Sequence, residues 1–214
     1  MESDQEKPPR SMKRTFMVFL WSAALLAVAA FGLNSALNMY LGGGSREVRY
    51  TGEADIRSVF TLTDHTGQVV TQADYSDRWQ LVFFGFTNCP DVCPTTLAYM
   101  ASVLDILGDD ADQVAPMFIT VDPERDTVQV MAEYVSVLHP RLIGLTGTEV
   151  QIAEAARNFR TWYERTEDDS APNGYFMAHG GYIYLMRPGG TYEAVFQEGG
   201  QTPEDLAETI RRKI

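Results

Sequence analysis

The only two cysteines of this 214-residue chain, Cys89 and Cys93, lie in the stretch NCPDVCP (88–94). Each is followed by proline, and the pair comes directly after the apolar run LVFFGF (81–86). Two thiols at this spacing can form a structural disulfide, act as a redox-active pair or supply two sulfur ligands to a metal ion. A bridge between residues four apart closes a very small loop, which gives little stabilisation. A purely structural disulfide is therefore the least favoured of the three interpretations.

The redox and the metal interpretations both stay open on the spacing alone. A helix that begins near Cys93 places both sulfurs at its positive end, where the thiolate is favoured over the thiol. Thioredoxin-type enzymes have two residues between their cysteines, whereas this motif has three: Pro90, Asp91 and Val92. Helical positions i and i+4 point the same way, so both sulfurs can reach one ion. Soft sulfur ligands select Cu(I), and two of them leave room for a third donor.

The third donor is expected to be one of the three histidines of the chain. His65 lies in a DHTG turn, and His139 precedes Pro140 at an expected helix end, where it can bind late carbonyls. Both are interpreted as structural. His179, in FMAHGGYIYLM, comes directly before an expected strand and beside two glycines that permit an unusual loop path. A lone histidine is more often structural than a ligand, so spacing alone leaves the role of His179 open.

The periodicity of apolar residues predicts the elements that position these side chains. We expect strands at 79–86, 114–121 and 141–147, helices at 94–107, 127–138, 149–160 and from Thr202 to 213, hairpins at 58–70 and 180–196, and an irregular acidic stretch at 164–174. This order predicts an α/β layer domain. A cysteine pair between a central strand and a helix favours the thioredoxin-like variant, with the site beyond the carboxyl ends of the strands.

The N-terminal part is expected to anchor the domain to a membrane. Residues 15–41 carry no charge and are mostly apolar, and about 20 such residues cross a bilayer as a helix. Four basic residues in 1–14 precede them, which predicts a single-pass protein with a cytoplasmic N-terminus and its domain outside. The alternative is a cleaved secretory signal with AVA as its small-residue site. Residues 42–54 are expected to be a linker and 55–214 the folded domain.

The exported part is acidic. From Arg46 onward it has 13 basic and 26 acidic residues, a net charge of −13, and Lys213 is its only lysine. This argues against nucleic-acid binding, because neutralising phosphates requires a basic face. The acidic surface is interpreted as a solvated surface that keeps the protein soluble, and the alternative is attraction of a basic partner or a cation.

The stretch LVFFGFTNCPDVCPTTL (81–97) resembles the signature of the Sco/SenC family, membrane-anchored copper chaperones for cytochrome c oxidase assembly. The likeness continues through FTLTDHTGQVV, VDPERDT and HGGYIYLMRPGG, so that it covers residues 55–212. The resemblance implies a thioredoxin-like fold and a site for one Cu(I) or Cu(II) ion formed by Cys89, Cys93 and His179.

The resemblance also implies partners and a location. The expected client is the copper centre of cytochrome c oxidase subunit II or another apo-cuproprotein, and a copper donor protein would load the site. The domain would lie on the periplasmic or intermembrane-space side. Two alternatives remain: a thiol–disulfide reductase that keeps the client's copper-ligand cysteines reduced, and a redox sensor.

Two residues depart from the family pattern. The family usually has an aspartate before the copper-binding histidine and a serine after it, and this chain has Ala178 and Gly180. Metal-bound histidines depend on the partner of their other ring nitrogen for orientation. Loss of the aspartate is therefore expected to soften the site or change partner recognition.

Several other residues near the motifs are expected to be structural. Asp91 is expected to cap the helix or receive backbone donors in its turn, and the alternative is that it tunes the cysteine pair or meets a partner. VDPERDT is expected to form a local ion-pair and capping arrangement through Asp122, Arg125 and Asp126. The aromatic residues that flank the acidic stretch are interpreted first as packing residues, with a docking surface as the alternative: Trp162, Tyr163, Tyr175 and Phe176.

Overall fold

The computed structural model describes residues 17, 21–22, 25–32, 55–171, 174–197 and 199–214. Within the expected anchor, the described residues are helical, and the remainder of 15–41, the tail 1–14 and the linker 42–54 lie outside the described ranges. Among the residues that the structure describes, no helix is both long enough and apolar enough to cross a membrane. The chain divides into two compact units, Met1–Val48 and Arg49–Ile214. The fold below is that of the second unit.

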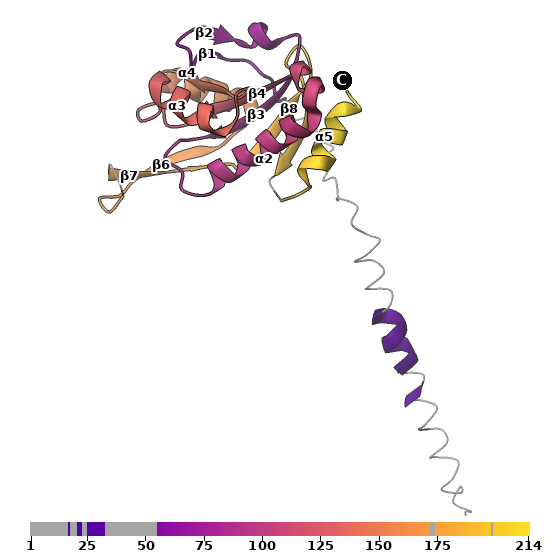
Figure 1. Cartoon of the computed structure of the whole chain (residues 1–214). Coiled ribbons are helices and arrows are strands. Elements are labelled where there is room, and N and C mark those ends of the chain that lie inside the picture. Colours follow the sequence, from indigo (N-terminus) through magenta and orange to yellow (C-terminus); the bar gives the residue numbers. More distant parts are fainter. Residues whose placement is uncertain (1–16, 18–20, 23–24, 33–54, 172–173, 198) are drawn as a thin grey trace, which may run out of the picture. The chain divides into compact units, whose positions relative to one another are not determined.

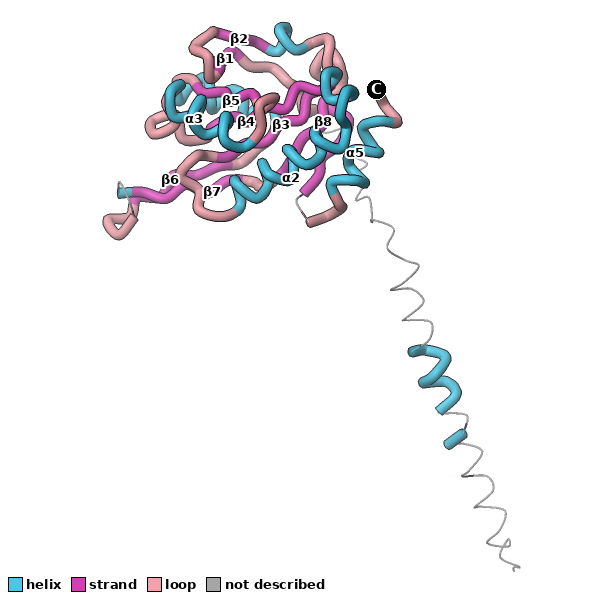
Figure 2. The backbone as a smooth tube through the Cα atoms, viewed as in Figure 1, coloured by secondary structure: helices cyan, strands magenta, loops and turns pink. Residues whose placement is uncertain are grey.

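A mixed seven-stranded sheet forms the centre of this unit (Figure 2). Its strands are β1 (Thr61–Asp64), β2 (Val69–Thr71), β3 (Trp79–Gly85), β4 (Val114–Thr120), β5 (Ile143–Thr146), β8 (Tyr182–Met186) and β9 (Tyr192–Gln197). They lie in the order β2-β1-β5-β4-β3-β8-β9. The central strands β3, β4 and β5 run parallel, and the other neighbours are antiparallel. Parallel neighbours require crossover connections, which the helices supply.

Helices cover both faces of the sheet (Figure 1). They are α2 (Val92–Leu107), α3 (Val128–Leu138), α4 (Glu149–Phe159) and α5 (Pro203–Arg211), with short 3-10 turns η1 (Gln72–Tyr75) and η2 (Gly108–Gln113). Successive side chains of β3 point to opposite faces. Phe83 stacks on Phe118, whose ring also meets Tyr134 of α3, whereas Phe84 packs against Phe159 of α4. Helix α5 contacts α2. The core therefore consists of two apolar layers on either side of the sheet.

Most predicted elements are confirmed. The two predicted hairpins appear as β1–β2 and β8–β9, and each predicted helix and central strand is present within a few residues of its expected bounds. The last helix begins as predicted, with Thr202 as its N-cap and Pro203 in its first turn.

The expectation of an irregular stretch at 164–174 is wrong for residues 164–167, whereas the described residues from 168 to 174 belong to no strand. Two strands, β6 (Tyr163–Glu167) and β7 (Tyr175–His179), pair antiparallel as a separate two-stranded sheet. The sequence of β6 hides it because four of its five residues are exposed, so no apolar alternation marks the strand. Cation–π contacts stabilise the pair: the guanidinium carbons of Arg125 and Arg165 lie 4.0 and 3.7 Å from the ring centre of Tyr175.

Candidate metal centre

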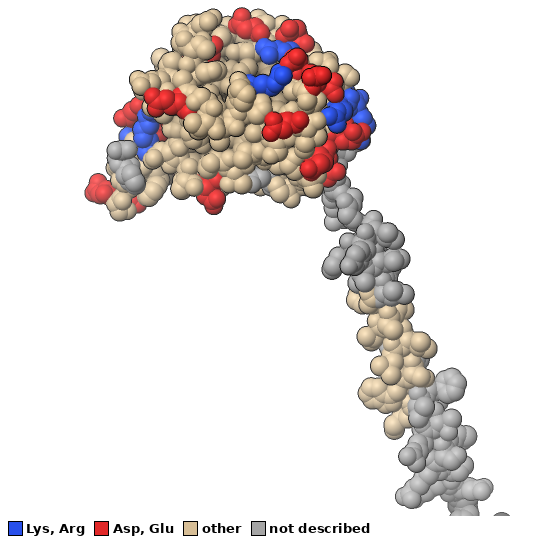
Figure 3. All heavy atoms as spheres, in the orientation of Figure 1, with Lys and Arg blue, Asp and Glu red and all other residues tan. Residues whose placement is uncertain are grey.

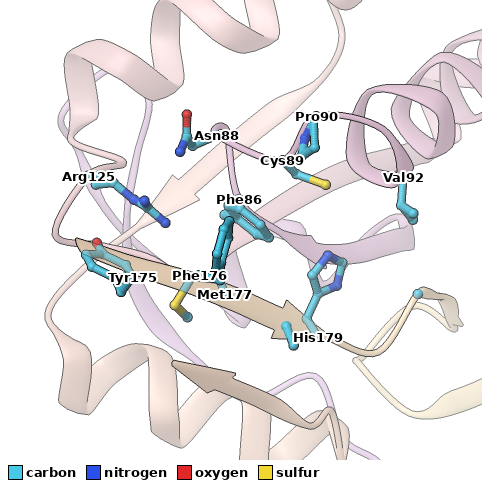
Figure 4. Close-up of a pocket in the computed structure, with 12 residues that line it drawn as sticks. Phe86, Asn88, Cys89, Pro90, Val92, Arg125, Tyr175, Phe176, Met177 and His179 are labelled. Atoms are coloured by element: carbon cyan, nitrogen blue, oxygen red, sulfur yellow. The ribbon is translucent and has the colours of Figure 1, made fainter. Parts of the chain in front are cut away.

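The three residues proposed as ligands lie together beyond the carboxyl ends of the central strands. Cys89 follows the carboxyl end of β3, Cys93 lies in the first turn of α2, and His179 ends β7. Their two sulfur atoms and one ring nitrogen all lie within 4.8 Å of one another. Figure 4 shows the Cys89 sulfur and the His179 ring facing each other across the end of a cavity. This is the edge beyond the strand carboxyl ends that the sequence predicted.

The cysteines are placed by the turn that joins β3 to α2. Cys89 precedes the helix, and its N–H donates to the carbonyl of Phe86 at 3.3 Å. The N–H of Cys93, in the first turn of α2, donates to the Cys89 sulfur at 3.4 Å. Both thiols are free. The sulfurs thus lie at the positive end of the helix as predicted, but the turn brings them together, because Cys89 lies outside the helix.

The expectation that this position favours the thiolate is wrong for Cys93. Its side chain has no exposed surface, and burial is the main cause that raises the pKa of the Cys93 thiol far above its ordinary value. The neighbouring Cys89 sulfur adds to the rise. Desolvation of the charged form therefore outweighs the helix end. A metal ion that binds here must displace the Cys93 proton.

The protonation state of His179 follows from its hydrogen bonds. Its Nδ1 lies 3.1 Å from the carbonyl oxygen of Gly180, and a carbonyl only accepts, so Nδ1 carries the proton. The unprotonated Nε2 then lies 3.3 Å from Cys93 Sγ, where it accepts a hydrogen bond from the Cys93 thiol. Burial lowers the pKa of His179, and the hydrogen bond to Gly180 acts in the opposite direction. Burial has the larger effect, so the neutral ring is favoured. A neutral imidazole with a free Nε2 is the form that binds metals.

Two phenylalanines and one backbone carbonyl orient the His179 ring. Phe83 and Phe86 each meet it edge to face, with ring centres 5.7 Å apart in both pairs. Ala178, which stands where the family usually has aspartate, is exposed and pairs with Glu164 across β6 and β7. The partner of the second ring nitrogen is the Gly180 carbonyl, so the ring orientation does not require a carboxylate at position 178. The predicted softening of the site stays a prediction.

The cysteine turn is tied to the end of β4 by Asp126. Its carboxylate accepts hydrogen bonds from the N–H and hydroxyl of Thr87, at 3.0 and 2.5 Å, and from the hydroxyl of Thr120 at 2.5 Å. Burial raises the pKa of Asp126, and these three donors act against the rise. The predicted ion pair of the same motif joins Arg125 to Asp122, whereas Asp126 binds the two threonines instead. Sequence reasoning missed this contact because Thr87 lies 39 residues away.

We expect Asp126→Ala to lower the free energy of unfolding by about 2–3 kcal/mol, because three donors lose their acceptor in a buried place. Urea unfolding followed by circular dichroism measures the change. Asp169→Ala is the matched control, since Asp169 is exposed and has no ion pair within the described ranges. Equal stability of the two variants would contradict the anchoring role of Asp126.

The other candidate residues lie elsewhere or act differently. His65 accepts a hydrogen bond from the N–H of Gly144, and His139 pairs with Asp105, so neither lies at the cluster. Asp91 is the N-cap of α2, but its side chain makes no capping hydrogen bond, which corrects the expected role.

The flanking aromatic residues divide between packing and surface. Tyr175 is buried and its hydroxyl donates to Asp122 at 2.8 Å. Tyr163 is partly buried and packs against the core. Trp162 and Phe176 are more than half exposed, so the interpretation as packing residues fails for these two.

A cavity of about 690 Å³ opens along β7, beside Cys89 and His179. It is lined by Phe86, Asn88, Cys89, Pro90, Val92, Arg125, Tyr175, Phe176, Met177, Ala178, His179 and Gly181. Aromatic and aliphatic side chains make up most of this lining (Figure 4). We call it the β7 groove.

The donor set fits a single soft metal ion. Two sulfurs and one imidazole nitrogen form the combination that favours copper among the common biological metals. Metal–sulfur and metal–nitrogen bonds are about 2.3 and 2.0–2.1 Å long at comparable zinc sites, so three ligand atoms spread evenly around one ion lie about 4 Å apart. The three ligand atoms lie within 4.8 Å of one another, so they must close by about 1 Å or less to bind one ion.

Comparison with known proteins supports the resemblance seen in the sequence. The family model SCO1/SenC matches residues 48–214. The mouse protein "Protein SCO2 homolog, mitochondrial" is 43% identical over 157 residues, which are 72% of this chain and 61% of that protein. The chain thus spans about three fifths of the length of this curated relative.

Solved structures give the same result for the fold. Bradyrhizobium japonicum ScoI with copper bound is 39% identical and superimposes with a TM-score of 0.69, over 74% of this chain and 99% of that chain. Arabidopsis thaliana ScoI with copper bound is 36% identical, with a TM-score of 0.68, over 74% and 97%. The predicted α/β class of the thioredoxin-like variant is confirmed by this likeness.

Proposed function

The chain belongs to the SCO1/SenC family, and on this premise we propose that it is a copper metallochaperone. It binds one Cu(I) or Cu(II) ion through the sulfurs of Cys89 and Cys93 and Nε2 of His179. The observation that carries the proposal is the unprotonated Nε2 of His179, which lies 3.3 Å from the Cys93 sulfur, while Nδ1 of the same ring donates to the Gly180 carbonyl. A lone structural histidine needs no such arrangement beside two free thiols.

The proposal includes delivery of the ion. The acceptor is an apo-cuproprotein, with the copper centre of cytochrome c oxidase subunit II as the client that the family resemblance favours, and a copper donor protein loads the site. A centre open to the β7 groove on one side supports transfer, because an acceptor ligand can approach without unfolding of the site. Copper moves by exchange of ligands, so its transfer requires no electron donor.

The proposed location is the outer face of a membrane. Residues 15–41 form a single-pass anchor, 1–14 a cytoplasmic tail and 42–54 a linker, and the copper-binding domain 55–214 lies in the periplasm or the intermembrane space. The uncharged apolar run supports this arrangement.

We expect the reduced full-length chain in detergent to bind one copper ion per chain. X-ray absorption at the copper edge should give two sulfur ligands and one nitrogen ligand, because the cluster offers that set and Cys93 is otherwise enclosed. No bound copper, or ligation by sulfur alone, would contradict the proposal.

A thiol–disulfide reductase is the second candidate, and the unequal exposure of the two cysteines favours it. Cys89 is partly exposed to the β7 groove, whereas Cys93 is buried behind it. Such a pair suits attack by one thiol and resolution by the other. The Cys89 thiolate would attack a client disulfide and release one client thiolate. Cys93, after losing its proton, would displace the second, which leaves a Cys89–Cys93 disulfide and a client reduced by two electrons. A redox sensor would use the same disulfide without a client disulfide.

A further inference from the structure

One edge of β7 has no strand beside it within the described ranges. β7 pairs with β6 alone, in a sheet of two strands. In an antiparallel pair, residues alternate between those that bond to the partner strand and those whose N–H and C=O groups point away from it. Strand edges of this kind accept an added strand from another chain.

The hydrogen bonds at both ends of the pair define which residues face the free edge. The N–H of Gly180 donates to the carbonyl of Trp162 at 3.0 Å, and the N–H of Asp168 to that of Gly174 at 2.9 Å. Both bonded positions of the β7 segment are even-numbered, so the even positions between them also bond to β6. The N–H and C=O groups of Tyr175, Met177 and His179 therefore point away from β6. No hydrogen bond to them occurs among the described residues.

This free edge borders the β7 groove. All five residues of β7, 175–179, line the groove. Alternate side chains of a strand point to opposite faces, so a groove that touches every residue in turn meets the strand along its edge. The turn after β3 forms the other wall, with Phe86, Asn88, Cys89 and Pro90. The two walls leave an elongated space that ends at the Cys89 sulfur and the His179 ring (Figure 4).

We propose that the copper acceptor docks by adding an extended segment to the free edge of β7. This inference rests on the proposed copper-transfer function and specifies its docking step. Main-chain hydrogen bonds to Tyr175, Met177 and His179 fix the register of the segment, so that one of its residues comes opposite His179. A cysteine, histidine or methionine at that position places a soft ligand beside Cys89, as transfer of copper requires. Apolar neighbours in the segment pack on Phe176, which is half exposed.

Exposed carboxylates near the β7 groove indicate the charge of the docking segment. Asp91, Glu164 and Asp169 are exposed and have no ion-pair partner in the part of the chain that the structure describes. On the face shown in Figure 3, acidic side chains are interspersed with Lys and Arg side chains. Glu164 lies directly across β6 and β7 from the small side chain of Ala178. A lysine or arginine of the added strand can pass over Ala178 and reach Glu164. The proposed occupant is therefore an extended, basic segment of the acceptor that carries a soft metal ligand.

Amide hydrogen exchange tests the docking mode directly. The copper-loaded full-length chain in detergent is mixed with the apo copper-binding domain of cytochrome c oxidase subunit II from the same organism. The amides of Tyr175, Met177 and His179 should gain at least tenfold protection in the complex, whereas those of Phe176 and Ala178, already bonded to β6, should change little. A complex in which the odd-numbered amides gain no protection, or the absence of any complex, would overturn the inference.

A proline substitution provides the second test. Met177→Pro removes an N–H that points to the free edge and leaves the bonds to β6 intact, as edge strands allow. Met177→Ala also removes the thioether side chain but keeps the N–H, so it is the matched control. We expect Met177→Pro to weaken binding of the acceptor domain about tenfold relative to Met177→Ala. Equal affinities of the two variants would overturn the inference.

Two further readouts separate the possible failures. Copper stoichiometry of the wild-type chain without acceptor tests the proposed function alone, so normal loading without docking contradicts only the edge inference. Light scattering of the chain alone tests whether the edge instead pairs with a second copy. A dimer that is lost in Met177→Pro and kept in Met177→Ala would assign the edge to self-association and overturn the acceptor as its occupant.

Discussion

His179→Ala is expected to lower the copper affinity of the chain by about 100-fold or more, while both cysteines still form and release a disulfide. Loss of a residue that only orients a metal ligand already costs about 10–100-fold in affinity, and this change removes the ligand itself. The turn that carries both cysteines should keep its conformation, because the contacts that place it come from Phe86, the first turn of α2 and Asp126. Competition with a copper chelator measures the affinity, and thiol titration after mild oxidation measures the disulfide.

Two matched controls make the His179 experiment specific. His65→Ala and His139→Ala remove the same side chain away from the cluster and should keep wild-type copper affinity. The His179 variant also loses two edge-to-face contacts, with Phe83 and Phe86, which amounts to about 1–3 kcal/mol of stability. Its folding is therefore checked by thermal unfolding before copper is added. If the folded variant supports oxidase assembly at ordinary copper levels, the reductase function replaces the chaperone function.

The elements with strong apolar patterns were predictable from the sequence alone. β3 and β4 are continuous apolar runs because helices bury both of their faces, and α2 shows a clear stripe of buried residues. These elements place the cysteine pair at the sheet edge without further information. Spacing alone did not select His179 as the third ligand, because a histidine 86 residues away meets the Cys93 sulfur only through the fold.

The predictions that failed concern features that depend on tertiary contacts, which a linear sequence pattern does not contain. β6 is a strand because it pairs with β7 and because Arg165 stacks on Tyr175, not because its own residues alternate. The protonation of Cys93 is controlled by burial, which reverses the expectation drawn from the helix end. Asp126 was expected in an ion pair, yet it binds Thr87 of the cysteine turn. In each case the deciding partner lies on another element.

Gly85, at the end of β3, is a further residue whose importance appears only in three dimensions. A Cβ atom added to it would lie 2.8 Å from the Cys93 sulfur and 2.9 and 3.0 Å from the rings of Phe118 and Phe83. These distances are shorter than side-chain contacts normally allow, and all three neighbours are fully buried. The glycine is thus required for the close approach of α2 to the sheet, which places Cys93 beside His179.

Gly85→Ala is expected to reduce both stability and copper affinity. Overpacking of a filled core costs about 1–3 kcal/mol, and the sulfur is the neighbour with the shortest distance to the added methyl group. Movement of that sulfur away from Nε2 of His179, now 3.3 Å distant, opens the ligand set. We therefore expect copper affinity to fall at least tenfold, measured by chelator competition, together with a lower unfolding midpoint in urea.

Gly181→Ala is the matched control for this change. Gly181 lines the β7 groove, and a Cβ there meets only Val92, at 3.9 Å, which is an ordinary contact. This variant should keep copper affinity within about threefold and lose no stability, because alanine also restricts the unfolded chain. If both glycine variants bind copper equally well, the Cys93 sulfur does not need its observed position, and the ligand geometry inferred for Cys93 and His179 is wrong. A selective loss in Gly85→Ala would link copper binding to the packing of α2 on β3.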